Sequence, residues 1–157
     1  HDVGKIAIPD RVLLKPGRLD HNEFEVMKSH TELGGRILKG TDIEMIEMAR
    51  NIACYHHEKW DGSGYPMGLA GGAIPIEARI VSLVDVYDAM VHKRIYKQPI
   101  SEEETLQYIR STSGSHFDPG IVQIFFNIID QIRQIKNQVC EIDKGLEISS
   151  FQAKRFT

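Results

Sequence analysis

The sequence has few cysteines, no long apolar run and little excess charge of either sign. Its two cysteines, Cys54 and Cys140, lie far apart without a Cys-x-x-Cys spacing, which argues against a disulfide framework and against a thiolate zinc site. No run of about 18 apolar residues is present, so we expect no membrane span. A net charge of -3 provides no global positive field for long nucleic acid, and leaves open a small phosphate ligand held by local cations.

The remaining composition is that of an ordinary globular protein. Apolar residues make up 41% and charged residues 26% of the 157 residues, enough to bury a continuous core in one compact domain. The sparse cysteines fit a reducing compartment, so we expect a cytoplasmic domain, alone or within a larger or membrane-anchored protein. Because neither an initiator methionine nor a leader precedes His1, we expect a fragment or a processed form.

Helical periodicity predicts an all-α fold, a helical bundle. Apolar residues recur every three or four positions within residues 20–37, 42–59 and 76–91, and in two further segments that open at Ser101 and at Asp118. We expect one domain over residues 1–135 and a tail over residues 136–157. Two interpretations of this tail stay open, a small hairpin around its Asp-Lys-Gly sequence or an irregular end.

Local signals predict where two helices begin and where the chain forms loops. Asp20 with Glu23 has the spacing of a capping box, and so has Ser101 with Glu104. Residues 61–75 contain five glycines and two prolines, too many for a helix interior. Loops are predicted at residues 9–20 and 61–75. Loops as long as the second one are usually functional or disordered, and we expect it to be a rigid turn that aims the histidines before it.

Histidines and aspartates gather at inward helix positions. They are His1, Asp2, His30, His56, His57 and Asp85. His30, for example, falls on the predicted inward stripe that runs from Phe24 to Ile37. A lone inward histidine is usually a hydrogen-bonded core residue, but so many buried polar groups are costly unless something pairs with them. Imidazole nitrogens hold divalent transition ions and a carboxylate can bridge two of them, so the set predicts a metal site.

Two segments resemble the signatures of a known family. His-Asp-Val-Gly-Lys-Ile at residues 1–6, and His-His-Glu-Lys-Trp-Asp-Gly-Ser-Gly-Tyr-Pro at residues 56–66, are similar to those of the HD-GYP subgroup of the HD phosphohydrolase superfamily. The resemblance implies an all-helical domain of the HD type that binds two or three divalent ions, iron or manganese. It further implies hydrolysis of cyclic di-GMP to pGpG or GMP by a metal-bridging hydroxide, in bacterial second-messenger signalling.

The resemblance also assigns roles to particular residues. The implied metal ligands are His1, Asp2 as the bridging carboxylate, His30, His56, His57 and Asp85. Lys5 is the implied partner of Asp2 in catalysis and would offset charge on a substrate phosphate. Arg94 and Lys97 resemble the cations that bind the ligand. Trp60 and Tyr65 are expected to be packing residues rather than platforms for a base.

Several alternatives stay open. Members of the family carry helices before the His-Asp pair, some of which supply a further ligand, so the number of metals is undecided. The family also implies an upstream sensory or receiver domain and a diguanylate cyclase (GGDEF) domain as a partner. The fold could instead serve a module that binds a cyclic dinucleotide or a cyclase without hydrolysis. It could also serve a hydrolase of another phosphoester, such as cyclic GMP-AMP.

Overall fold

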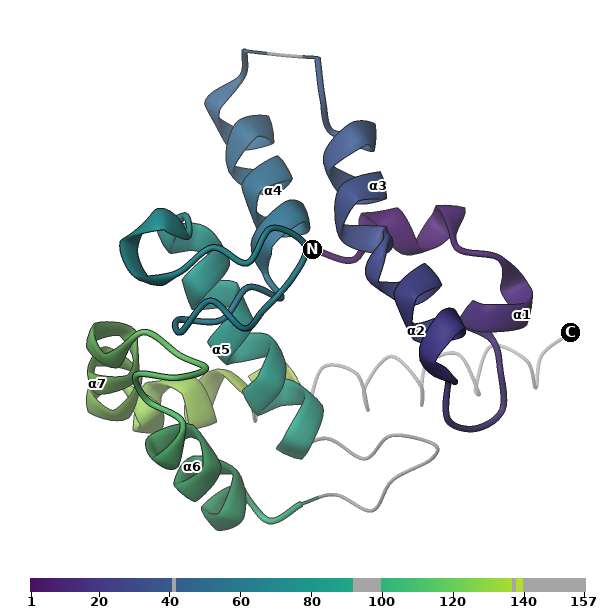
Figure 1. The fold of residues 1–157 in the computed structure, drawn as a ribbon. Helices are drawn as coiled ribbons and strands as arrows, with labels where there is room; N and C mark the ends of the chain where they lie inside the picture. Colours follow the sequence, from purple (N-terminus) through teal and green to yellow (C-terminus); the bar gives the residue numbers. More distant parts are fainter. Residues whose placement is uncertain (41, 92–99, 137, 140–157) are drawn as a thin grey trace, which may run out of the picture. The chain divides into compact units, whose positions relative to one another are not determined.

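The computed structural model describes residues 1–40, 42–91, 100–136 and 138–139. Within these residues the chain forms helices and no strand, which confirms the predicted all-α fold (Figure 1). The elements are the 3-10 helices η1 (Val3–Ala7) and η2 (Gly71–Ala73) and the α-helices α1 (Asp10–Leu13), α2 (His21–Lys28), α3 (His30–Ile37), α4 (Glu44–Tyr55), α5 (Ile76–Val91), α6 (Glu102–Ser111) and α7 (Pro119–Asn127). None of the helices in this described part has the length and apolar character needed to cross a membrane.

The chain packs as two compact units, His1–Val122 and Gln123–Thr157. The first unit contains η1 to α6 and the start of α7. Its buried apolar side chains are Ile8, Val12, Ala53, Ile74, Ala78, Leu83, Tyr87, Ile109, Phe117 and Val122. The second unit contains the end of α7 and a further helical stretch over residues 129–136. The hairpin considered for the tail lies outside the described residues, and a domain boundary at residue 135 stays a prediction.

Helices α3 and α4 form an antiparallel pair, joined by the residues between Ile37 and Glu44 (Figure 1). In such a pair the start of the first helix and the end of the second lie at the same end. This topology brings His30, the first residue of α3, next to His56, which follows α4, although the two are 26 positions apart. Helix α5 packs against α4 and brings its own side chains to the pair.

The predicted helix over residues 20–37 is broken in two at Ser29. Side chains take over the backbone carbonyls of the last turn of α2: Ser29 Oγ donates to Val26 O, Thr31 Oγ1 donates to Lys28 O, and His30 Nδ1 lies 2.7 Å from Met27 O. Such bonds offer the backbone an alternative to the helical ladder. The inward stripe therefore does not run through the whole segment, and Phe24 and Ile37 are 45% and 49% exposed.

Other local predictions are confirmed, with one correction. The capping boxes of Asp20 with Glu23 and of Ser101 with Glu104 are both formed. The segment after Pro9, predicted as a loop, instead contains α1. Proline is tolerated at the start of a helix, because the N–H that it lacks would have no partner there.

Close backbone approach fixes η1 against α3. A Cβ atom on Gly4 would collide with the carbonyl oxygen of His30 and would lie 2.5 Å from the nitrogen of Gly34. Both atoms belong to the backbone of α3, so neither can move aside as a flexible side chain would. The absence of a side chain at Gly4 therefore allows η1 to bring the preceding His1 and Asp2 to the start of α3.

Candidate metal centre

Three histidines form the centre of the candidate site. His30, His56 and His57 each offer a ring nitrogen, and these three atoms lie within 4.8 Å of one another. His30 and His56 are 1% and 2% exposed, whereas His57 is half-buried. Helix α3 supplies His30, and the chain that leaves α4 supplies His56 and His57.

Hydrogen bonds orient two of these rings so that their free nitrogens converge. His30 Nδ1 lies 2.7 Å from Met27 O and His56 Nδ1 lies 2.9 Å from Ile52 O. A carbonyl oxygen only accepts, so both Nδ1 atoms carry the proton and both Nε2 atoms present lone pairs. These two Nε2 atoms are 3.4 Å apart. Two lone pairs facing each other in a buried site are unfavourable, and a cation between them would satisfy both.

The carboxylate of Asp2 lies between the imidazole of His1 and those of His30 and His56. Its Oδ1 is 3.6 Å from His30 Nε2 and 3.9 Å from His56 Nε2. Its Oδ2 is 3.4 Å from His1 Nε2. The two oxygens of one carboxylate thus face different histidines, which is the arrangement that a carboxylate shared by two cations requires.

Helix α5 contributes Asp85 to the same cluster. Asp85 Oδ1 is 3.6 Å from His1 Nε2. The structure therefore brings together all six residues predicted as ligands, drawn from the start of the chain, α3, the end of α4 and α5. Imidazole nitrogens with carboxylate oxygens form a donor set that suits a divalent transition ion.

Burial and neighbouring charges shift the pKa values of His56, His57 and Asp2. Desolvation, together with His56 and His30, lowers the pKa of His57 to about 3. Desolvation also lowers the pKa of His56, although its backbone hydrogen bond opposes this. Burial alone would raise the pKa of Asp2, but the hydrogen bond and charge of Lys5 outweigh burial and lower it. At neutral pH His56 and His57 are therefore neutral imidazoles and Asp2 is an ionised carboxylate, the forms that bind metals.

We expect the metal-free protein to lose stability in acid because of His57. An unfolded histidine titrates near 6.5 and the folded His57 near 3, so between these pH values the unfolded chain binds more protons. Above about pH 6.5 the imidazole is neutral in both states and costs nothing, whereas between that pH and about 3 the free energy of unfolding falls by about 1.4 kcal/mol for each pH unit of acidification. Denaturant unfolding of metal-free protein at several pH values measures this slope. The His57→Asn variant should show a shallower slope, and equal slopes would contradict the prediction.

Of the three cationic residues expected to contact the substrate, the structure describes only Lys5. Lys5 Nζ donates to Asp2 Oδ2 at 2.6 Å, so Lys5 is held beside the carboxylate proposed to bridge. Arg94 and Lys97 lie outside the described residues, and their role stays a prediction.

A buried glutamate organises the glycine-rich loop, and the sequence analysis missed it. Glu58 is 2% exposed, and its two carboxylate oxygens accept the backbone N–H groups of Met67 at 2.7 Å and Leu69 at 3.0 Å. The loop folds back so closely that a Cβ atom on Gly64 would lie 2.6 Å from the carbonyl oxygen of His57. The only signal in the sequence is that Glu58 directly follows the two histidines.

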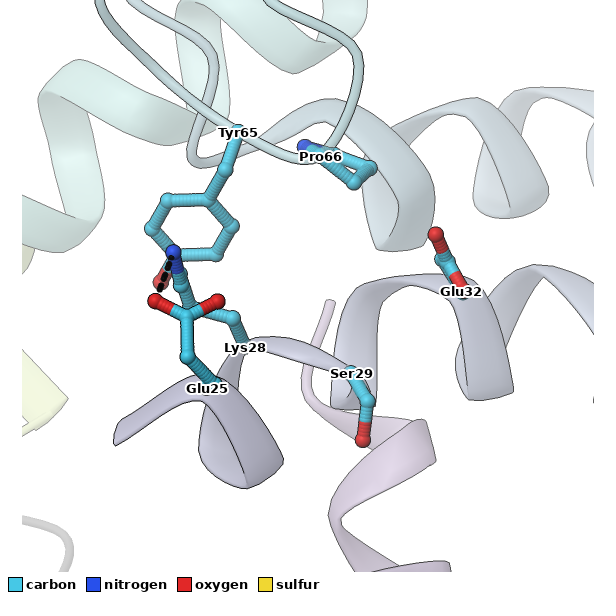
Figure 2. A pocket seen from close by; sticks show the side chains of 6 residues that line it. All are labelled: Glu25, Lys28, Ser29, Glu32, Tyr65 and Pro66. Atoms are coloured by element: carbon cyan, nitrogen blue, oxygen red, sulfur yellow. Dashed lines mark ion pairs between the residues drawn. The ribbon is translucent and has the colours of Figure 1, made fainter. Parts of the chain in front are cut away.

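A pocket of about 260 Å³ opens beside this loop (Figure 2). It is lined by Glu25, Lys28, Ser29, Glu32, Tyr65 and Pro66. Lys28 Nζ forms an ion pair with Glu25 Oε1 at 2.6 Å, and the same ammonium lies 5.5 Å from the centre of the Tyr65 ring. Tyr65 also stacks on His57, with ring centres 4.8 Å apart. Tyr65 therefore lines the pocket and also contacts the histidine cluster.

The fold and the cluster together define a class of protein: an all-α domain that gathers histidines and aspartates as donors for divalent cations. The chain belongs to the HD domain family, which matches residues 1–121, and within it to the HD-GYP type of phosphohydrolase. The expected resemblance is thereby confirmed.

Curated relatives agree with this assignment. The chain is 47% identical to a cyclic di-GMP phosphodiesterase of Thermotoga maritima, over 86% of this chain and 37% of the relative. It is 44% identical to a 3'3'-cGAMP-specific phosphodiesterase of Vibrio cholerae, over 87% of this chain and 26% of the relative. The chain thus spans roughly a third of the length of these relatives.

The solved structure is a cyclic GMP-AMP-specific phosphodiesterase of Vibrio cholerae. It superposes with a TM-score of 0.55 at 23% identity, over 85% of this chain and 34% of the other. At this identity the similarity concerns the fold, and it agrees with the helical architecture described above.

Proposed function

We propose that this domain is a metal-dependent phosphodiesterase that hydrolyses cyclic di-GMP to pGpG or GMP. The observation that carries the proposal is the position of Asp2, whose two carboxylate oxygens face different imidazoles of the cluster. A carboxylate shared in this way can hold two cations close together, as two-metal hydrolases of phosphoesters require. Relatives named as cyclic di-GMP phosphodiesterases support the choice of substrate.

The proposed ligands divide into two groups around this carboxylate. His30, His56 and His57 would hold one cation together with Asp2 Oδ1, and His1 and Asp85 would hold the next with Asp2 Oδ2. When bound, the ions would supply Lewis acidity, which acidifies water and neutralises phosphodiester charge. We propose two or three ions, iron or manganese.

The protein itself contributes orientation and charge. The backbone hydrogen bonds of His30 and His56 hold each ring with its free nitrogen directed at the cluster. The ammonium of Lys5 lies at the edge of the cluster, partly exposed, where it would offset negative charge that develops on a substrate phosphate. Arg94 and Lys97 are proposed to bind the substrate phosphates.

A second substrate has specific support. The 44% identical relative is named for 3'3'-cGAMP, and its identity to this chain is close to that of the cyclic di-GMP enzymes. Both molecules are cyclic dinucleotides with the same phosphodiester backbone, and differ in one base. The proposed metal centre would act on the shared backbone, so the bases must be distinguished elsewhere.

Turnover of both substrates by metal-loaded protein tests the proposal. We expect protein reconstituted without oxygen with Fe²⁺ or Mn²⁺ to release pGpG or GMP from cyclic di-GMP at least about a hundredfold faster than metal-free protein. Faster turnover of 3'3'-cGAMP would favour the second substrate. Metal binding with nucleotide binding, but without turnover of either, would overturn the enzymatic proposal in favour of a binding module.

The remaining partners are proposed for a longer protein. A relative from Xanthomonas campestris, 47% identical, is named as a response regulator, which supports an upstream receiver domain. An upstream sensory domain would fit a signalling protein equally. A diguanylate cyclase (GGDEF) domain as a partner stays a prediction that rests on the family resemblance alone.

A further inference from the structure

His57 differs from the other two histidines of the cluster in how its ring is held. The rings of His30 and His56 are each fixed by a bond from Nδ1 to a backbone carbonyl. Among the described residues, no hydrogen bond or ion pair reaches the ring nitrogens of His57. An imidazole without such a bond is free to rotate about its side-chain torsions unless packing restrains it.

The packing that restrains His57 comes from Tyr65. The two rings are stacked, with centres 4.8 Å apart and planes 27° from parallel. The backbone N–H of Tyr65 also donates to the carbonyl oxygen of His57 at 3.2 Å, so the two residues are joined twice. In the part of the chain that the structure describes, the other rings packed near His57 are those of His56 and His30, which belong to the cluster itself.

Tyr65 is in turn held by a contact with α2. The ammonium of Lys28 lies 5.5 Å from the ring centre of Tyr65, and an ion pair with Glu25 fixes that ammonium (Figure 2). The ring of Phe24 forms a T-shaped contact with the same ring, with centres 6.3 Å apart and planes at 80°. The loop that carries Tyr65 is itself held by the hydrogen bonds that the backbone N–H groups of Met67 and Leu69 donate to the carboxylate of Glu58.

We infer that Tyr65 is a positioning residue of the metal centre, whose aromatic ring does for His57 what a backbone carbonyl does for His30 and His56. The inference rests on the metal site of the proposed function and adds to it the means by which one ligand is oriented. It gives the packing role expected of Tyr65 a specific partner, the ring of His57. The ring, and not the hydroxyl, carries this role, because the contact with His57 is a stack.

Metal affinity of the metal-free protein tests the inference without any assay of turnover. Tyr65→Phe keeps the ring, and Tyr65→Leu removes it while staying apolar. We expect Mn²⁺ or Co²⁺ affinity, measured by competition with a chelating dye, to stay within about twofold for Tyr65→Phe and to fall about tenfold or more for Tyr65→Leu. The visible spectrum of the Co²⁺ form reports the ligands around the ion, so it should change in Tyr65→Leu and stay the same in Tyr65→Phe.

A double-mutant cycle separates positioning from a general effect on stability. In a His57→Ala background the ligand to be oriented is gone, so Tyr65→Leu should cause no further loss of metal affinity. An equal loss in both backgrounds, or equal affinities for Tyr65→Phe and Tyr65→Leu, would overturn the inference while leaving the metal site in place. Failure of the wild-type protein to bind either ion would overturn the proposed metal centre as well.

A variant outside the loop covers the case in which Tyr65→Leu does not fold. Lys28→Met removes the cation that lies over the Tyr65 ring and keeps an unbranched side chain of similar length. We expect a smaller fall in affinity, in the same direction, with a change in the Co²⁺ spectrum. An unchanged affinity and spectrum in a folded Lys28→Met variant would contradict the contact chain from α2 to His57.

Discussion

Asp2→Asn is expected to abolish both metal binding and turnover. The substitution keeps the size of the side chain but removes the negative charge, and it replaces one of the two oxygens that face the histidines with an NH₂ group, which cannot bind a cation. Substitution of a residue that only hydrogen-bonds to a metal ligand already lowers metal affinity or activity by about 10- to 100-fold. Loss of the shared carboxylate itself should therefore lower metal affinity and kcat by more than about a hundredfold. Metal content after reconstitution, and release of pGpG or GMP, measure the two effects.

The same variant should leave the stability of the metal-free protein almost unchanged. Asp2 is paired with Lys5, and both side chains are 39% exposed, so the ion pair contributes at most about 1 kcal/mol. Asp42→Asn is the matched control, because Asp42 is exposed and precedes α4 away from the cluster. Asp2→Asn protein that retains its metals and its rate would contradict the proposed bridge.

Gly4→Ala is the second change expected to have a large effect, although it removes none of the proposed metal ligands. The new Cβ atom would collide with the carbonyl oxygen of His30 and approach the nitrogen of Gly34, so η1 must move away from α3. His1 and Asp2 would move with η1. We expect about 3 kcal/mol of lost stability together with lost metal binding, measured by denaturant unfolding and metal titration.

Two other glycines provide a graded control for Gly4. A Cβ atom on Gly72 would meet nothing within 4 Å, so Gly72→Ala should change neither stability nor metal affinity. A Cβ atom on Gly34 would lie 3.2 Å from the Cβ of Ala53, so Gly34→Ala should have an intermediate effect. Equal effects of all three substitutions would show that close approach of η1 to α3 is not what places His1 and Asp2.

Predictions from local sequence succeeded where neighbouring residues alone decide the structure. The capping boxes that begin with Asp20 and Ser101 are formed because a short polar side chain and a glutamate three residues later satisfy the first N–H groups of a helix themselves. The inward position of His56 follows from the periodicity of α4 in the same way. Periodicity failed at Ser29, where side chains compete with the helix for its own carbonyls.

The sequence by itself determined the helical fold class and the family, and it predicted the histidines and aspartates that the structure brings together. Only the tertiary structure decided which atoms face one another: Asp2 Oδ1 toward His30 and His56, and Tyr65 against His57. It also decided that Glu58 holds the loop through two N–H groups from residues nine and eleven positions later. Helix formation depends on neighbours along the chain, whereas these contacts depend on how η1, the helices and the loop pack, which no local pattern encodes.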